Sequence, residues 1–123
     1  MKRALIIDDA LFMREVIRDA IEPMVEEILT AGDKDTAIEL IRSKKPDLIT
    51  LDISLDCEDP AQGLELLKET SSHVTDNCHV VVITALDQQW LKDELKSNGA
   101  VAFFQKPFDK QALQTTIKEL LER

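Results

Sequence analysis

Five short apolar runs, each followed by a longer amphipathic segment, set the limits on what this chain can fold into. The runs occupy residues 4–7, 27–30, 47–51, 79–83 and 101–104. Most of them are continuous rather than alternating, which is typical of strands that are covered on both faces. We therefore expect five buried strands, of which the run at 27–30 is the weakest.

In the segments that follow these runs, apolar residues recur at helical spacing and indicate five amphipathic helices. The helical patterns cover residues 12–21, 37–41, 64–67, 90–95 and 113–121. Five βα units predict an α/β protein with a five-stranded parallel sheet and helices on both of its faces. The leading arrangement is a flavodoxin-like, doubly wound (βα)5 fold with strand order 2-1-3-4-5, in which sites form beyond the carboxyl ends of the strands.

Turn and capping residues agree with these boundaries. Pro23 ends or breaks the first helix, and Pro46 closes the second one before a strand. Gly99 is placed to stop the fourth helix, and Asp109 is placed to cap the last.

The length and charge of the chain restrict its class. Its 123 residues fit one domain, spanning 1–123, that can close a core without disulfides or metals. The net charge of -9 argues against nucleic acid or an anionic membrane as the main partner and favours cations, metal ions or basic protein surfaces. The two cysteines have no metal-ligand spacing, and we find no signal peptide or membrane span, so we expect a cytoplasmic protein with free thiols.

Chemically active groups stand where four of the predicted strands end. Asp8 and Asp9 follow the first strand, and Asp52 follows the third. Thr84 closes the fourth strand, and Lys106 follows the fifth. In a 2-1-3-4-5 sheet these strand ends lie along one edge, so three carboxylates, one hydroxyl and one ammonium should converge.

The charges in such a cluster limit what it can do. Three carboxylates within a few ångströms repel one another, and some take up protons unless a cation neutralises them. Oxygen ligands at this density suit Mg²⁺ or Mn²⁺ rather than zinc. A divalent cation, a lysine and a hydroxyl together form a good place for a phosphoryl group. One carboxylate could itself be the nucleophile and form an acyl phosphate.

Each of these residues has a simpler interpretation when it is taken alone. Asp9 could cap the first helix, and Asp52 could be an ordinary turn aspartate. Thr84 could be a strand-end threonine, and Lys106 could be a surface lysine. The joint pattern favours a site, because four separate strand ends supply the matching groups in the matching order.

A known family carries this combination of motifs. The matching segments are Asp8-Asp9, Asp52, Thr84-Ala85 and Lys106-Pro107-Phe108. Together they resemble the receiver domain of two-component response regulators, and the resemblance runs from the first strand to the final helix. It implies that Asp52 accepts a phosphoryl group from a sensor histidine kinase, a phosphotransfer protein or a small phosphodonor.

The resemblance also implies a set of metal ligands. Asp8, Asp9 and Asp52 would hold Mg²⁺, or alternatively Mn²⁺, with Asp9 favoured as the direct ligand. The backbone carbonyl of Ser54 would complete the protein ligands.

The same resemblance implies a switching mechanism. Lys106 would pair with the phosphoryl group, and the Lys106–Pro107 peptide bond is expected to be cis. Phosphorylation would add about two negative charges and draw Thr84 inward, and Phe103 would turn into the space that Thr84 leaves. The surface formed by the helix at 90–95, the strand at 101–104 and the helix at 113–121 would then change.

The implied function is a phosphorylation-activated binding switch. A downstream protein target would bind the reshaped surface, and the domain would contact neither nucleic acid nor membrane. It would not be an enzyme with a separate substrate, because the phosphoryl transfer and hydrolysis that it assists are its own.

Three features stand apart from the usual pattern of the family. The loop from Asp52 to Gly63 is long and acidic, which we interpret as a surface insertion, with tuning of metal affinity or of partner choice as the alternative. Phe103 stands where many relatives have tyrosine. Trp90 is the sole tryptophan, and we expect it to belong to the core, with an exposed interface position as the alternative.

Other functions stay open at the level of the sequence. The segment at 9–14 favours a stand-alone chemotaxis-type receiver, but the chain could also come from a longer regulator with a C-terminal output domain. A phosphatase with an aspartyl nucleophile is a rival, although Ser54 stands where such enzymes of the haloacid dehalogenase type usually have a second aspartate. A flavodoxin-like cofactor binder ranks last, because Asp8 and Asp9 would repel a phosphate.

Overall fold

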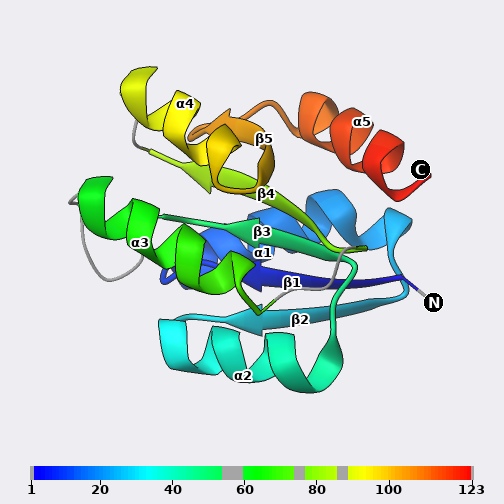
Figure 1. The fold of residues 1–123 in the computed structure, drawn as a ribbon. Coiled ribbons are helices and arrows are strands. Elements are labelled where there is room, and N and C mark those ends of the chain that lie inside the picture. The colour runs from blue at the N-terminus through cyan, green and yellow to red at the C-terminus, as the bar shows by residue number, and fades with distance from the viewer. Residues whose placement is uncertain (1, 54–59, 74–76, 86–88, 123) are drawn as a thin grey trace.

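A five-stranded parallel sheet lies between helices in the computed structural model, which describes residues 2–53, 60–73, 77–85 and 89–122 (Figure 1). The strand order β2-β1-β3-β4-β5 confirms the expected flavodoxin-like, doubly wound arrangement. The strands are β1 (Arg3–Ile7), β2 (Glu27–Ala31), β3 (Leu48–Leu51), β4 (His79–Thr84) and β5 (Ala100–Gln105). The helices are α1 (Leu11–Ile21), the short 3-10 helix η1 (Glu22–Met24), α2 (Lys34–Lys44), α3 (Pro60–Ser71), α4 (Gln89–Ser97) and α5 (Lys110–Leu121).

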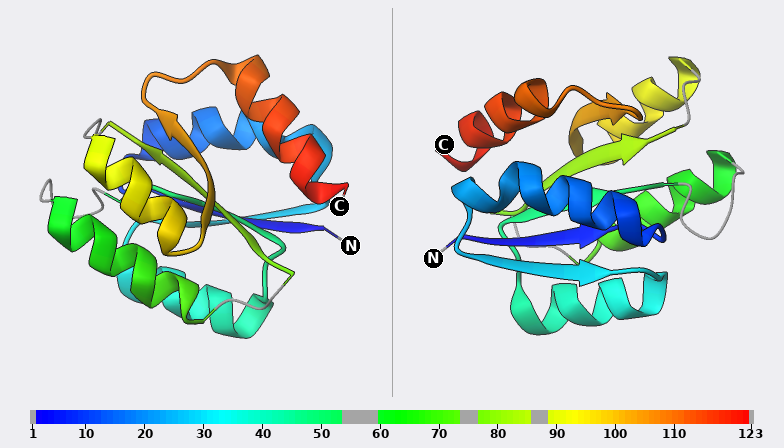
Figure 2. Two further views of the ribbon diagram at one scale, coloured as in Figure 1. Left: turned by 45° about the horizontal axis from the view of Figure 1, so that its top comes forward. Right: turned by 180° about the vertical axis from the view of Figure 1, so that it is seen from behind.

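The helices cover both faces of the sheet (Figure 2). Helices α1 and α5 pack on one face, while α2, α3 and α4 pack on the other. Strand β1 shows why its apolar run is continuous: Ala4 and Ile6 belong to the core under α1 and α5, whereas Leu5 and Ile7 belong to the core under the other three helices. Because successive side chains of a strand point to opposite faces, a strand that is covered on both faces buries consecutive residues, and these are mostly apolar.

The boundaries of several helices follow the expected signals. The side chain of Asp109 caps α5 by accepting a hydrogen bond from the Gln111 backbone nitrogen at 3.1 Å. Gly99 follows α4 with a φ of 110°, a conformation that glycine adopts without steric cost. Helix α1, however, starts from Ala10 without a side-chain cap, so the simpler interpretation of Asp9 as a helix cap is wrong.

Trp90 is not a core residue, which corrects our expectation from the sequence. Its side chain lies on α4 and is 51% exposed. The buried stripe of α4 is formed by Leu91 and Leu95, which are four residues apart and therefore share one face of the helix. Trp90 precedes this stripe by one position, about 100° around the helix, and so faces outward.

The helices of this fold are short. The longest of those described, α3 and α5, have 12 residues each. A helix needs about 20 apolar residues to cross a bilayer. None of the helices in the described ranges is therefore long and apolar enough to span a membrane.

Candidate functional site

The carboxyl ends of the strands hold the candidate site residues in fixed positions. Beyond the last residue of β1, the Asp8 backbone nitrogen donates to the Ala31 carbonyl at 3.1 Å. Beyond β3, the Asp52 nitrogen donates to the Ile7 carbonyl at 2.9 Å. The pairing of parallel strands thus continues one residue into the loops, which fixes the backbone from which both carboxylates project.

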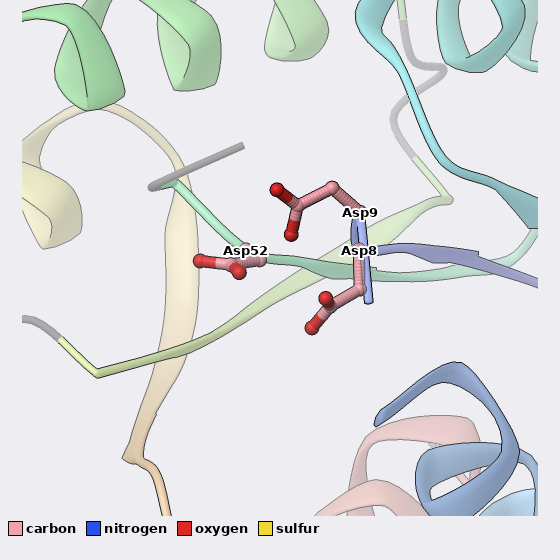
Figure 3. A group of neighbouring side chains, drawn as sticks. All are labelled: Asp8, Asp9 and Asp52. Atoms are coloured by element: carbon pink, nitrogen blue, oxygen red, sulfur yellow. The ribbon is translucent and has the colours of Figure 1, made fainter. Parts of the chain in front are cut away.

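Three carboxylates meet at this edge. Asp8 and Asp52 are buried, whereas Asp9 is exposed, and one carboxylate oxygen from each lies within 4.8 Å of the others. Figure 3 shows Asp8 and Asp9 projecting from the end of one strand and Asp52 from the end of the adjacent strand, with the three carboxylates near one another. The cluster is therefore anchored in the core and open to solvent on the side of Asp9.

One ammonium lies against the two buried carboxylates. Lys106 Nζ is 2.6 Å from Asp8 Oδ2 and 3.0 Å from Asp52 Oδ2, and its side chain is only 16% exposed. The lysine follows β5, where its backbone nitrogen donates to the Thr84 carbonyl at 2.8 Å. The Lys106–Pro107 peptide bond is cis, as expected from the sequence.

The environment shifts the pKa values of two of these groups. Burial raises the pKa of Asp8 above its usual 3.8 and outweighs the hydrogen bonds from Lys106 and from the Ala10 nitrogen, which lower it; the charge of Asp52 raises it as well. Burial lowers the pKa of Lys106, but hydrogen bonds to Asp8 and Asp52 raise it above its usual value. Lys106 therefore stays protonated, while burial still disfavours the negative charge of the Asp8 carboxylate.

The donor set fits a hard divalent cation. Mg²⁺ binds carboxylate oxygens at about 2.1 Å, so two of its ligands can be at most about 4.2 Å apart. The three oxygens already lie within 4.8 Å of one another, so a small adjustment of the side chains would let them contact one ion. Three carboxylates exceed the single ammonium of Lys106 by two negative charges, which one divalent cation would balance. The residues present thus suit Mg²⁺ or Mn²⁺ and offer none of the sulfur ligands that zinc commonly uses.

The other predicted site residues differ in how far the structure describes them. Thr84 is fully buried at the end of β4, next to the strand that leads to Lys106. Phe103 is half-buried in β5, opposite Val82 of β4, and so lies within the sheet rather than at its end. Ser54 and most of the long acidic loop lie outside the described residues, so the proposed carbonyl ligand stays a prediction.

Two contacts near the site were not anticipated from the sequence. Arg14 Nη1, on α1, donates a hydrogen bond to the Asp8 carbonyl at 2.8 Å. Lys92 Nζ, on α4, lies 5.3 Å from the centre of the Phe103 ring, within the range of a cation–π interaction. The first contact spans six residues and depends on how α1 packs beside the end of β1, and the second joins α4 to β5, so the apolar patterns did not indicate either of them.

Comparison with known proteins places this geometry in a family. Residues 4–118 match the model of the response regulator receiver domain. The chain belongs to the response regulator receiver family. This membership makes it a receiver domain of the kind used in two-component signalling, as its motifs indicated.

Individual relatives match this receiver over most or all of its length. It is 34% identical to the chemotaxis protein CheY of Thermotoga maritima over 108 residues, which cover 87% of each chain. It is 27% identical to the chemotaxis protein CheY of Halobacterium salinarum over 120 residues, covering 98% of this chain and 97% of the other. A solved two-component response regulator from Clostridium difficile matches with a TM-score of 0.87 at 27% identity, covering 100% of this chain and 98% of the other.

Proposed function

We propose that this receiver domain, residues 1–123, is a switch that turns on when Asp52 accepts a phosphoryl group. The observation that carries the proposal is the position of the Asp52 carboxylate. It is 3% exposed, lies 3.0 Å from the Lys106 ammonium, and shares a cluster with Asp8 and Asp9. A carboxylate in this setting has a cation on one side and a second cation site on the other, which are the features that phosphoryl transfer requires.

The proposed reaction is transfer from a phosphohistidine to Asp52. A carboxylate oxygen of Asp52 bonds to phosphorus while the phosphorus–nitrogen bond of the donor breaks. The imidazole leaves with the electron pair of that bond and takes up a proton, and an acyl phosphate remains on Asp52. Lys106 neutralises charge on the phosphoryl oxygens, since its raised pKa keeps it protonated.

A divalent cation would support this reaction. Asp8, Asp9 and Asp52 would hold Mg²⁺, together with the Ser54 carbonyl that the sequence predicts. When bound, Mg²⁺ supplies charge neutralisation for the phosphoryl oxygens. Asp9, as the exposed member of the cluster, faces the solvent from which the ion and the phosphodonor arrive.

The surface beside the site favours a protein as the phosphodonor. Leu11 and Phe12 begin α1 one residue after the acidic pair, and they are 64% and 76% exposed. Large apolar side chains at the surface indicate a contact with another protein. A sensor histidine kinase or a phosphotransfer protein would cover these residues while it presents its phosphohistidine to Asp52.

The output of the switch would be a binding event on the surface of α4, β5 and α5. Thr84 and Phe103 would couple the site to this surface, because Thr84 ends β4 and Phe103 lies in the adjacent strand β5. On the surface itself, Trp90 of α4 and Val101 of β5 are about half exposed, at 51% and 50%. A downstream protein with an apolar contact surface suits this face, and the domain would need no substrate other than its own Asp52.

The experiment that tests the proposal measures intact mass after incubation with Mg²⁺ and a small phosphodonor such as acetyl phosphate. We expect one added phosphoryl group, which is lost in Asp52→Asn and absent when the metal is chelated. Asp93→Asn, which alters an exposed aspartate of α4, is the matched control and should be phosphorylated normally. The absence of an adduct under every condition would refute the proposal, and steady turnover of a phosphate ester would favour a phosphatase instead.

A further inference from the structure

Arg14 holds the peptide group that joins the two acidic residues of the site. Its Nη1 lies 2.8 Å from the Asp8 carbonyl oxygen, and this carbonyl belongs to the peptide bond between Asp8 and Asp9. The orientation of that peptide group sets where the Asp9 side chain projects relative to the buried Asp8. A hydrogen bond from a guanidinium is charge-assisted and therefore stronger than one between neutral groups.

The remaining polar groups of Asp8 are held by other elements. Its backbone nitrogen donates to Ala31 of β2, its Oδ1 accepts from the Ala10 nitrogen, and its Oδ2 accepts from Lys106. Arg14 supplies the partner for the carbonyl. With it, each backbone and side-chain polar atom of Asp8 has a partner, and none is left free to reorient.

Gly32 leaves the space that the Arg14 guanidinium occupies. A β-carbon at position 32 would lie 2.8 Å from Arg14 Nη1 and 3.6 Å from its Cζ, whereas the Asp8 carbonyl oxygen would be 3.9 Å away. The only severe contact is therefore with the end of a flexible side chain, which can swing away. A methyl group at this position would displace the guanidinium at little cost to the backbone.

We propose that Arg14 is a positioning residue for the metal site. Gly32 supports this role, because it has no side chain in the space that the Arg14 guanidinium occupies. This inference rests on the proposed function, since it concerns the Mg²⁺ that the acidic cluster would hold. By fixing the Asp8–Asp9 peptide group, Arg14 keeps the exposed Asp9 carboxylate beside the buried carboxylates of Asp8 and Asp52.

The charge of Arg14 acts in the opposite direction from its hydrogen bond, which makes the proposal testable. If Arg14 mattered only as a positive charge beside an acidic site, removing it would strengthen the binding of a divalent cation. If it positions the ligands, removing it weakens binding. Gly32→Ala separates the two effects further, because it retains the charge and displaces the hydrogen bond.

The experiment is a double-mutant cycle read by calorimetric titration of Mg²⁺ into the unphosphorylated protein. We expect Arg14→Ala and Gly32→Ala each to weaken Mg²⁺ binding about tenfold, the low end of what residues behind a metal ligand contribute. The double variant should equal Arg14→Ala, because without the guanidinium the added methyl group meets only ordinary contacts. Arg14→Lys, which keeps one cationic donor, should fall between wild type and Arg14→Ala.

Two controls separate positioning from general stability. Arg18→Ala removes an exposed arginine from the same helix and should leave Mg²⁺ affinity unchanged. In urea denaturation with a chelator present, the free energy of unfolding of Gly32→Ala should be close to that of wild type, although the variant binds Mg²⁺ more weakly. Should Arg14→Ala fail to fold, Gly32→Ala and Arg14→Lys still decide the question.

The outcomes that overturn the inference differ from those that overturn the proposed function. Unchanged or tighter Mg²⁺ binding in Arg14→Ala or Gly32→Ala, or additive losses in the double variant, would refute the positioning role while wild type still binds Mg²⁺. A wild-type protein that binds no Mg²⁺ would refute both.

Discussion

Lys106 donates a hydrogen bond to Asp52 across 54 positions of the sequence, with 3.0 Å between Nζ and Oδ2. The same ammonium contacts Asp8 Oδ2 at 2.6 Å, so one cation serves two buried carboxylates. The ammonium follows β5, and the carboxylates follow β1 and β3, so the contact exists only when the sheet is complete. Lys106 therefore links the stability of the fold to the charge of the site.

Removing this ammonium should destabilise the metal-free protein. In Lys106→Met, the Asp8 and Asp52 carboxylates would face each other in the interior without their cationic partner. We expect a loss of about 3 kcal/mol in the free energy of unfolding at pH 7, as for other buried ion pairs that lose one member. Urea denaturation in a chelator, followed by circular dichroism, measures this change.

Lys110 offers a matched control for that substitution. Its Nζ also lies 3.0 Å from a carboxylate oxygen, that of Asp19, but the two side chains are 56% and 73% exposed. Because exposed ion pairs contribute little, Lys110→Met should change the free energy of unfolding by no more than about 0.5 kcal/mol. Equal losses in the two variants would contradict the special role of burial at Lys106.

Asp8→Asn should stabilise the metal-free protein at neutral pH. Burial raises the pKa of Asp8, so the folded protein holds the Asp8 proton more tightly than the unfolded chain does. The resulting penalty is absent below the unfolded pKa of 3.8 and is complete once the pH exceeds the raised folded value. We expect a gain on the order of 1 kcal/mol at pH 7, because the amide avoids the cost of burying a charged carboxylate, which Lys106 offsets only in part.

The pH dependence of that gain provides its own check. The difference between Asp8→Asn and wild type should shrink as the pH falls from neutral toward the unfolded pKa of 3.8. Asp33→Asn should instead destabilise the protein at neutral pH, because hydrogen bonds from Thr36 lower the pKa of Asp33. This loss should also shrink as the pH falls, since the contribution of Asp33 disappears once it is protonated. A stabilisation by Asp8→Asn that does not depend on pH would show that charge is not its cause.

The fold could be predicted from the sequence because each strand of this sheet carries its own signal. Strand β1 is buried on both faces, so its apolar run is continuous, and the residues that leave β1 and β3 are carboxylates. Because the strand ends of a parallel sheet share one edge, the order of elements was enough to bring Asp8, Asp52 and Lys106 together.

The features that the sequence did not reveal depend on contacts between elements. The contact of Arg14 with Asp8 needs the space at Gly32, which lies beside them only through the pairing of Ile7 with Ala31. The outward position of Trp90 depends on which apolar residues of α4 face the sheet, and the preference of tryptophan for cores pointed the wrong way.

The exposure of Trp90 makes it a natural probe of the switch. It is the sole tryptophan, and it lies on α4 within the proposed output surface. We expect its fluorescence emission to change when Mg²⁺ and acetyl phosphate are added together, because phosphorylation would reshape the packing of α4 against β5.

Two variants show whether this fluorescence change reports the proposed mechanism. Asp52→Asn should abolish the change, because no phosphoryl group can be attached. Thr84→Ala should still gain a phosphoryl group by mass but should lose most of the fluorescence change. A full response in Thr84→Ala would mean that Thr84 does not couple the site to α4.

The most direct test of the central claim is to locate the phosphoryl group chemically. Borohydride reduces an aspartyl phosphate to homoserine, which survives proteolysis and can be placed by mass spectrometry of the peptides. After incubation with Mg²⁺ and acetyl phosphate, the account predicts homoserine at position 52 and unmodified aspartate at Asp8 and Asp9. Homoserine at either of those residues, or at no residue in a protein that has gained mass, would contradict it.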